Sequence, residues 1–154
     1  MGYSMNTIYV KNARWISITK IIDGHDGILS VANEMGNIPF DIKRVYYIYN
    51  LINHRNVMRG KHAHKSLEQV MFCLNGQCSV TLDDGNRRQN IILDQPDKGI
   101  FLGTHLWHTM QEFNSNCILL VFASQLYNED DYIRNYDEFL ETVKVPRLIS
   151  HTIK

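Results

Sequence analysis

The sequence predicts an all-β fold, a jelly-roll barrel with a short C-terminal helix. Short runs rich in Val, Ile, Tyr and Phe recur about every ten residues and are separated by Gly, Asn and Asp, which is typical of short β-strands. Only one segment, near the C-terminal end, has helical periodicity. Because a domain built from many short strands must protect its strand edges, we expect a closed sandwich or barrel.

The composition indicates one globular domain spanning residues 1–154. Hydrophobic residues make up 44% of the chain, and 16 basic residues balance 16 acidic ones. Such a composition argues against a disordered tail and against a nucleic-acid-binding protein. No apolar run reaches the roughly 18 residues that span a bilayer, and the start from Met1 to Arg14 lacks the pattern of a targeting signal. We therefore expect a cytoplasmic protein with no membrane or nucleic-acid partner.

Each run of apolar residues is expected to form one strand. In chain order the expected strands are Thr7–Val10, Trp15–Ile22, Ile28–Ala32, Ile42–Tyr49, Gly60–His64, Glu68–Leu74, Gln77–Leu82, Arg87–Leu93, Gly99–Leu102, Leu106–Phe113 and Cys117–Ser124. Asn75-Gly76 and Asp84-Gly85 mark tight turns, since these pairs tolerate the positive φ angles that hairpins need. Cys73, Cys78 and Cys117 lie in apolar runs without CxxC spacing, which predicts free thiols in the core.

The C-terminal helix is expected over about residues 129–143. The apolar residues from Ile133 to Val143 fall on one stripe at helical spacing, Asn128 is a suitable N-terminal cap, and Pro146 ends the pattern. Because a single amphipathic helix cannot bury its own stripe, we expect it to pack on the β core.

Residues 59–69 carry most of the chemistry. Side chains two residues apart on a strand share a face, so His62 and His64 are expected to point into one cavity. This HxH pair, with a glycine before it and another after it, resembles the first motif of the cupin superfamily, whose fold is a double-stranded β-helix. Cupins often bind a metal with this motif. Their spacing places Gln69 where a carboxylate ligand belongs, however, and a neutral amide is a poor ligand for a divalent ion. A second cupin-like stretch supplies His108 as a third imidazole.

Two features predict a phosphate-binding wall beside these histidines. Residues 54–65 contain four basic residues, Arg59 among them, and no acid. Alternation along the strand at 42–49 places Arg44 and Tyr46 together on one face. An arginine and a tyrosine facing a barrel interior make a poor core but a suitable binding wall, because Arg pairs with phosphate oxygens through two hydrogen bonds. A phosphorylated small molecule is the expected ligand.

Four segments together resemble the sugar 3,4-ketoisomerases, metal-independent cupin enzymes that act on dTDP-4-keto-6-deoxyglucose. They are Ile38–Tyr47, Arg59–Lys65, Leu74–Gly76 and Asp131–Tyr136, and the resemblance covers about residues 16–140. It implies a jelly-roll homodimer that exchanges N-terminal strands, one dTDP-sugar in each barrel, and no cofactor or metal. The family's 3-keto product passes to an aminotransferase that makes 3-amino sugars for surface polysaccharides such as lipopolysaccharide. Residues 1–15 form an extension that the resemblance does not explain.

The resemblance also implies roles for single residues. The catalytic set is His62, His64 and Tyr46. Arg44 and Arg59 match the family's positions near the nucleotide sugar, and we add Gln69 and His108 to the expected substrate-binding set. Moving a ketone from C4 to C3 requires removal of the C3 proton to give an enediolate. Histidine, with an ordinary pKa of about 6.5, suits this proton shuttle, and a hydrogen-bond donor stabilises the oxyanion. The sequence does not distinguish which of the two histidines is the base.

One position bears on the configuration of the product. In the family, the residue after the tryptophan of the second motif tends to be His in enzymes that give the galacto configuration at C4, and Arg in those that give gluco. Here His108 follows Trp107, which predicts dTDP-3-keto-6-deoxygalactose. A second discriminating position, before Gly27, holds Asp26 and matches neither branch.

Two other functions are open from the sequence. One is a metal-dependent cupin, a dioxygenase or an isomerase, with His62, His64 and His108 as ligands, and it predicts a tightly bound transition metal. The other is a cupin that binds a sugar nucleotide without turning it over. The presence of Tyr46 together with the two HxH histidines counts against this binding module, because binding alone needs no proton shuttle.

Overall fold

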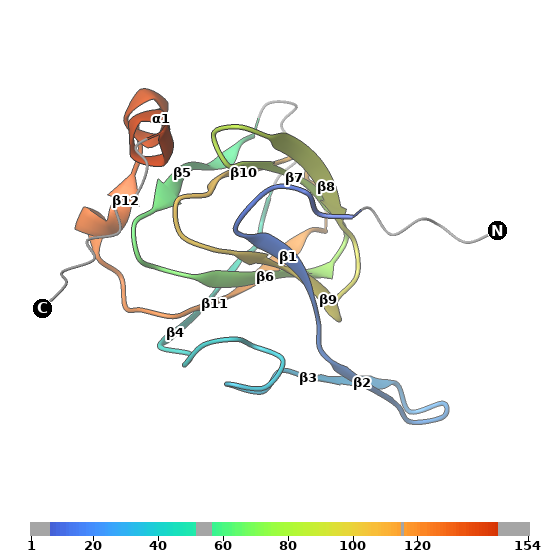
Figure 1. The fold of residues 1–154 in the computed structure, drawn as a ribbon. Helices are drawn as coiled ribbons and strands as arrows, with labels where there is room; N and C mark the ends of the chain where they lie inside the picture. The colour runs from blue at the N-terminus through green and yellow to red at the C-terminus, as the bar shows by residue number, and fades with distance from the viewer. Residues whose placement is uncertain (1–6, 52–56, 115, 145–154) are drawn as a thin grey trace, which may run out of the picture.

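The computed structural model describes residues 7–51, 57–114 and 116–144, and its strands form two five-stranded antiparallel sheets that enclose a barrel (Figure 1). The first sheet has the order β1 (Ala13–Ser17), β9 (Lys98–Leu102), β6 (Gln69–Asn75), β11 (Ile118–Ala123) and β4 (Arg44–Ile48). The second has the order β12 (Tyr132–Ile133), β5 (Arg59–His64), β10 (Trp107–Gln111), β7 (Cys78–Asp83) and β8 (Arg88–Leu93). Neighbours in each sheet are mostly distant in the chain, as in a jelly roll. The predicted all-β cupin fold is confirmed.

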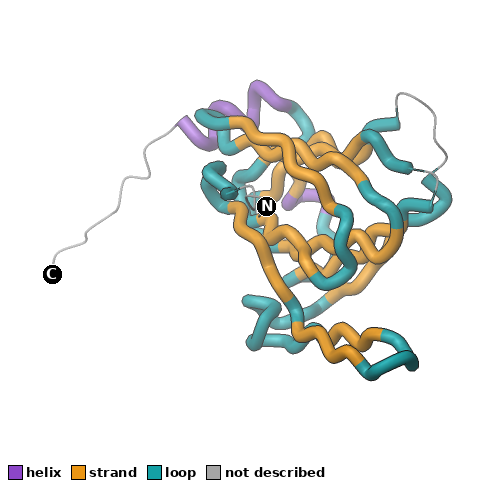
Figure 2. The backbone as a smooth tube through the Cα atoms, turned by 90° about the vertical axis from the view of Figure 1, so that its right-hand side faces the viewer, coloured by secondary structure: helices purple, strands orange, loops and turns teal. Residues whose placement is uncertain are grey.

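A β-hairpin stands apart from the two sheets. β2 (Thr19–Ile22) and β3 (Ile28–Val31) form a separate two-stranded sheet that projects from the barrel in Figures 1 and 2. The strand predicted over Trp15–Ile22 is therefore divided, because β1 pairs with β9 whereas β2 leaves the barrel. Every residue of β2 is exposed, including two isoleucines. An isolated two-stranded hairpin is marginally stable in water, so this one needs a further surface to pack against.

Apolar side chains fill most of the space between the two sheets. One cluster includes Met71, Cys73, Ile100, Leu119 and Val121 from the first sheet and Cys78, Val80, Leu82, Ile91 and Met110 from the second. The three cysteines are buried and none of them forms a disulfide, as predicted.

Toward one end of the barrel, the inward-facing side chains of these strands are polar instead of apolar. Gln69 begins β6 two residues before the core residue Met71, and His108 lies two residues before the core residue Met110 on β10. Tyr46, on β4, packs against the same cluster. Since residues two apart on a strand share a face, these polar side chains point into the barrel beside its apolar core.

The helix α1 (Tyr136–Lys144) lies against the second sheet, as predicted (Figure 1). Its Phe139 is fully buried in a cluster with Ala63 of β5, Ile133 of β12 and Trp107 of β10. Ala63 alternates with the two inward-facing histidines, so α1 covers the outer side of the strand that carries them.

The helix begins later than the predicted residue 129. Asn128 does act as a cap, but it caps a 3₁₀ turn, η1 (Glu129–Asp131). Ile133 then lies in β12, which pairs with β5. The apolar stripe that predicted one long helix therefore combines Ile133 of a strand with residues of α1. A buried isoleucine fits a strand as well as a helix, so the pattern alone did not separate them. The predicted stop at Pro146 lies outside the described residues.

The strand predicted over Thr7–Val10 is not formed. The side chain of Gln89 accepts a hydrogen bond from the backbone N–H of Tyr9 and donates one to the carbonyl of Thr7. A side chain therefore takes the place of a neighbouring strand's backbone. Val10 is nevertheless buried in the core, so this part of the predicted extension packs on the barrel.

Candidate active site

Three histidines meet at the polar end of the barrel. His62 and His64 come from β5, and His108 comes from β10, where it pairs directly with His62. The ring centroid of His62 lies 4.9 Å from that of His64 and 4.8 Å from that of His108. The ring of Tyr132, on β12, packs against His62 at 4.9 Å and against His64 at 4.4 Å. The predicted pair is thus part of a larger aromatic cluster.

Each imidazole directs its Nδ1 toward an oxygen that can only accept a hydrogen bond. These acceptors are the Gly60 carbonyl for His62 (3.1 Å), the Leu106 carbonyl for His108 (3.3 Å) and the Asp131 carboxylate for His64 (3.0 Å). Nδ1 therefore carries the hydrogen in each neutral ring, and Nε2 is left as an acceptor.

Burial keeps these imidazoles neutral near pH 7. It lowers the pKa of His62 to about 4, with the nearby His64 as the second cause. Burial also lowers the pKa of His64, against the opposing effect of Asp131, and it lowers the pKa of His108 well below its ordinary value. A general base must be unprotonated to act, so the rings are in the state that proton abstraction needs.

Stability is expected to fall as the pH drops from about 6.5 to about 4. An unfolded histidine titrates near 6.5, whereas His62 in the folded protein titrates at about 4. Between these values only the unfolded state takes up this proton, so the stabilisation is complete above pH 6.5 and is lost as the pH falls through about 4. The shift corresponds to roughly 3 kcal/mol. Urea denaturation at a series of pH values measures it, and a His62→Asn variant should show a shallower decline. An equally steep decline in that variant would assign the effect to other groups.

A second polar group lies on β4 and β6. Nε2 of Gln69 donates a hydrogen bond to the hydroxyl oxygen of Tyr46 at 2.7 Å, and the guanidinium of Arg44 lies 5.2 Å from the centroid of the Tyr46 ring. Burial raises the pKa of Tyr46 to about 12, so the hydroxyl keeps its proton. Because Gln69 acts as the donor, the Tyr46 proton is available for another acceptor.

Three buried side-chain atoms have no hydrogen-bond partner among the described residues. They are Nε of Arg44, Nε2 of His64 and Oε1 of Gln69, and no other described residue has such an atom. Leaving a buried polar atom unsatisfied costs about 1–3 kcal/mol, so such atoms are rare. All three lie on residues that the sequence predicted as site residues. Their grouping indicates a polar ligand that would complete the bonding.

The chain between β11 and α1 adds residues outside the predicted catalytic and substrate-binding sets. The carboxylate of Glu129 pairs with the guanidinium of Arg134 at 2.7 and 3.0 Å and accepts a hydrogen bond from the Tyr127 hydroxyl. Arg134 also lies 4.3 Å from the centroid of the Tyr132 ring, beside the histidines. The run Asp131–Tyr136, which carries part of the family resemblance, was the available signal for these residues.

Some predicted positions lie elsewhere. Arg59 begins β5 with an exposed side chain, and among the described residues no hydrogen bond or ion pair links it to the histidines. Of the basic residues predicted to form a wall, Lys61 is exposed and Arg55 lies outside the described residues. Of the basic residues predicted from the sequence, Arg44 is found at the cluster, in addition to Arg134. Asp26 is exposed in the turn between β2 and β3.

No group of three or more His, Cys, Asp or Glu side chains in residues 7–51, 57–114 and 116–144 is arranged to hold a metal ion. Gln69, at the position where metal-binding cupins carry a carboxylate, is hydrogen-bonded to Tyr46 instead. The part of the chain that the structure describes therefore offers no such ligand set for the metal-dependent alternative. The metal content of the purified protein tests that alternative directly.

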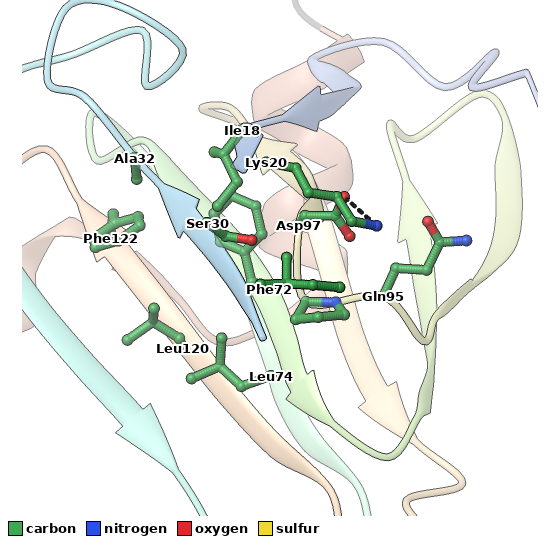
Figure 3. Close-up of a pocket in the computed structure, with 12 residues that line it drawn as sticks. Ile18, Lys20, Ser30, Ala32, Phe72, Leu74, Gln95, Asp97, Leu120 and Phe122 are labelled. Carbon is green, nitrogen blue, oxygen red and sulfur yellow. Dashed lines mark ion pairs between the residues drawn. The ribbon is translucent and has the colours of Figure 1, made fainter. Parts of the chain in front are cut away.

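A separate hollow of about 660 Å³ lies beside the hairpin, outside the barrel (Figure 3). It is lined mainly by apolar side chains, which include Ile18, Ile28, Phe72, Leu74, Leu120 and Phe122. The ion pair between Lys20 and Asp97 (3.4 Å) borders it. Lys20 and Asp97, the titratable side chains among its described lining residues, are paired with each other, and the rest of the lining is suited to packing.

Comparison with known proteins gives a consistent result. The family model described as FdtA: WxcM-like, C-terminal, matches residues 11–144. The chain is 51% identical over 124 residues to TDP-4-oxo-6-deoxy-alpha-D-glucose-3,4-oxoisomerase of Aneurinibacillus thermoaerophilus, covering 80% of this chain and 87% of that protein.

Solved structures agree with this match. A variant of the 3,4-ketoisomerase QdtA from Thermoanaerobacterium thermosaccharolyticum, in complex with TDP-4-keto-6-deoxyglucose, superposes with a TM-score of 0.83 at 39% identity, over 88% of this chain and 96% of that one. The WlaRB TDP-quinovose 3,4-ketoisomerase of Campylobacter jejuni gives a TM-score of 0.80 at 42% identity, over 86% of this chain and 99% of that one.

None of the helices in the described residues has the length and apolarity to span a membrane.

Proposed function

The chain belongs to the sugar 3,4-ketoisomerases of the FdtA (WxcM-like) family, and we propose that it converts dTDP-4-keto-6-deoxy-D-glucose into the 3-keto isomer. The observation that carries this proposal is the meeting of His62 and His64 inside the barrel as neutral bases, with Nε2 of His64 buried and without a partner. A dTDP-sugar substrate also fits a cytoplasmic location, because a charged nucleotide sugar does not cross a bilayer unaided.

The proposed reaction is internal to the sugar. A base removes the proton from C3, a double bond forms between C3 and C4, and the negative charge moves to O4. Transfer of the O3 proton to O4 and return of a proton to C4 then leave the ketone at C3 and a hydroxyl at C4. The alcohol carbon is oxidised and the ketone carbon is reduced within one molecule, so an acid–base set is sufficient and no redox cofactor is needed.

We assign these steps to the polar end of the barrel. His62 and His64 exchange the protons, since both rings are neutral and offer Nε2 as an acceptor. The Tyr46 hydroxyl donates to O4 as that oxygen gains charge, and the Gln69 amide orients the hydroxyl. Arg44, with an unsatisfied Nε, is suited to an oxygen of the nucleotide diphosphate.

Two further assignments concern the substrate and the product. Arg59 is exposed on the strand of the HxH pair, where a bound diphosphate would give it a partner. His108 faces His62, within reach of a sugar held there. We propose that His108 favours protonation that leaves the galacto configuration, giving dTDP-3-keto-6-deoxygalactose.

The experiment that tests the function uses metal-stripped protein and dTDP-4-keto-6-deoxyglucose in D₂O, with the sugar followed by proton NMR. The expected result is a 3-keto sugar with deuterium at C4, whose configuration identifies the product branch. Activity that returns only after a metal is added would replace this function with the metal-dependent cupin. Tight dTDP binding without exchange of the C3 proton would instead support the binding module.

We also propose that the enzyme is a homodimer that exchanges its N-terminal strands. Ile21, Ile22, Ile28 and Leu29 of the hairpin are 48–69% exposed, although these are among the most apolar residues of the chain. The outer face of β4 next to the hollow exposes Val45 and Tyr47 as well. A second copy of the chain would cover both surfaces, and an exposed apolar patch of this kind is typical of an interface.

Charge placed on the hairpin is therefore expected to separate the subunits. An Ile22→Glu, Ile28→Glu variant should change from dimer to monomer in light scattering, because two carboxylates cannot be buried in an apolar interface without a large cost. Leu126→Glu is the matched control, since Leu126 is 70% exposed and lies outside the hairpin. A double variant that remains dimeric, or a wild-type monomer, would contradict the exchange.

A further inference from the structure

Asp131 is a buried carboxylate with two distinct sets of contacts. It lies at the end of η1, immediately before β12, and only 6% of it is exposed. Oδ2 accepts a hydrogen bond from Nδ1 of His64 at 3.0 Å and a longer one from the Leu67 backbone N–H at 3.3 Å. Oδ1 accepts from the backbone N–H of Ser66 at 2.8 Å and from the Ser66 hydroxyl at 2.6 Å. Oδ2 thus meets the imidazole and, at a longer distance, the loop after β5, while Oδ1 holds that loop through Ser66.

The contact with Oδ2 fixes where the proton of His64 resides. An ionised carboxylate can only accept, so the hydrogen of the neutral ring is on Nδ1 and the lone pair is on Nε2. Nε2 is buried and has no partner among the described residues, in a cluster where the ring also packs against His62 and Tyr132. The opposite tautomer would carry its hydrogen on Nε2, and the lone pair of Nδ1 would then face the negatively charged carboxylate of Asp131.

The carboxylate is ionised where this role requires it. Burial favours its neutral form, but the hydrogen bonds from Ser66, His64 and Leu67 outweigh burial, and the pKa of Asp131 is lowered. His62 differs in this respect, because its Nδ1 faces a neutral carbonyl of Gly60. Only His64 therefore has a full negative charge behind the ring, which would stabilise the imidazolium formed when Nε2 takes a proton.

We infer that Asp131 is a positioning residue, which holds His64 in the tautomer whose Nε2 accepts a proton from the sugar. This inference rests on the proposed ketoisomerase function and adds a residue to it. Asp131 does not touch the sugar and acts only through His64. The same side chain also has structural contacts, to Ser66 through Oδ1 and to Leu67 through Oδ2, and the Ser66 contact can be changed without touching the bond to His64.

Asp131→Asn is the variant that separates them. The backbone N–H groups of Ser66 and Leu67 can both only donate, and the shorter Ser66 contact (2.8 Å against 3.3 Å), joined by the Ser66 hydroxyl, favours the amide orientation that keeps Oδ1 in place and turns the NH₂ toward His64. That NH₂ donates to Nδ1 and forces the hydrogen of His64 onto Nε2. We expect kcat to fall by about 100-fold or more, with KM changed by less than about threefold, because the base is lost while the binding groups remain.

The decisive readout is the protonation of the ring nitrogens, measured by ¹⁵N NMR of histidine-labelled protein without substrate. In the wild type, Nδ1 of His64 should carry the hydrogen and Nε2 should not, and in Asp131→Asn this should reverse. Ser66→Ala is the structural control, because it removes one bond to Oδ1 and leaves the contact with His64. It should lower the melting temperature without changing the tautomer or kcat. Asp130→Asn, at an exposed neighbouring carboxylate, controls for the loss of charge.

Several outcomes would overturn the inference. A protonated Nε2 of His64 in the wild type would overturn it. This measurement needs no variant, so it tests the inference even if Asp131→Asn fails to fold. An unchanged tautomer in Asp131→Asn, or a reversed tautomer with wild-type kcat, would also contradict it. A loss of kcat in Ser66→Ala equal to that in Asp131→Asn would reduce Asp131 to a structural role. A wild-type protein without turnover would refute the proposed function, while the ring nitrogens still report whether Asp131 holds His64.

Discussion

Turnover is expected to fall by about 10²–10⁴-fold when either His62 or His64 is replaced by asparagine. Asparagine places an amide NH₂ near the position of Nδ1, so the bonds to the Gly60 carbonyl and to the Asp131 carboxylate can be kept. The lone pair on Nε2 has no counterpart in asparagine. The variants should therefore fold and bind dTDP with nearly unchanged affinity, while exchange of the C3 proton stops.

Proton NMR in D₂O measures the turnover, and calorimetric titration with dTDP measures the binding. His105→Asn is the matched control, since the His105 ring contacts Thr142 of α1 on the outer side of the sheet. That variant should keep its turnover. Full turnover in either site variant would remove that histidine from the chemistry, and loss of dTDP binding together with turnover would indicate a damaged barrel.

Much of the barrel follows from local pattern. Every strand predicted between residues 28 and 124 is present, with bounds that differ by only a few residues, because alternating apolar side chains and Gly-containing turns leave few other arrangements. The turn at Gly76, for example, has a φ of 73°, as the Asn-Gly pair predicts. The hairpin was harder to predict, since the residues of β2 look like those of a barrel strand. Their exposure depends on tertiary pairing, since β1 pairs with β9 of the barrel whereas β2 pairs with β3.

Only part of the candidate site could be predicted, because local sequence patterns reveal some of its residues and not others. Strand alternation and motif spacing bring out Tyr46, Gln69 and the HxH pair, because each lies in a short segment with a recognisable pattern. The partner of His64 was missed, since Asp131 is 67 positions away and the contact exists only because β12 pairs with β5. Arg59 begins the strand that carries the HxH pair, and its role with the nucleotide diphosphate stays a prediction.

The register between β5 and β10 explains why a glycine precedes the histidines. Thr109 pairs with Gly60 and the next residue of β10, His108, pairs with His62, so Lys61 is an extra residue in a β-bulge. Without the bulge Lys61 would lie opposite His108 and would point into the barrel. Gly60 and Lys61 both adopt positive φ angles, 82° and 59°, to form it. The bulge therefore brings His62, and not a lysine, into the cluster.

Gly60→Ala is accordingly expected to lower the free energy of unfolding by roughly 2–5 kcal/mol and to reduce turnover in the protein that still folds. A Cβ at this position would lie 2.7 Å from the carbonyl oxygen of His108 and 3.3 Å from Cα of Thr109, so the two strands must move apart. Strand separation adds about 1–3 kcal/mol to the roughly 1–2 kcal/mol that a side chain costs at positive φ. It also displaces the Gly60 carbonyl that holds Nδ1 of His62.

Gly24→Ala separates these two contributions. Gly24 has a φ of 51°, but a Cβ there meets nothing within 4 Å, so only the backbone cost applies. Urea denaturation should show a loss of about 1–2 kcal/mol for Gly24→Ala and a clearly larger loss for Gly60→Ala. Equal losses would mean that the bulge tolerates a methyl group. In that case the close approach of β5 and β10 would not be what fixes His62 in the site.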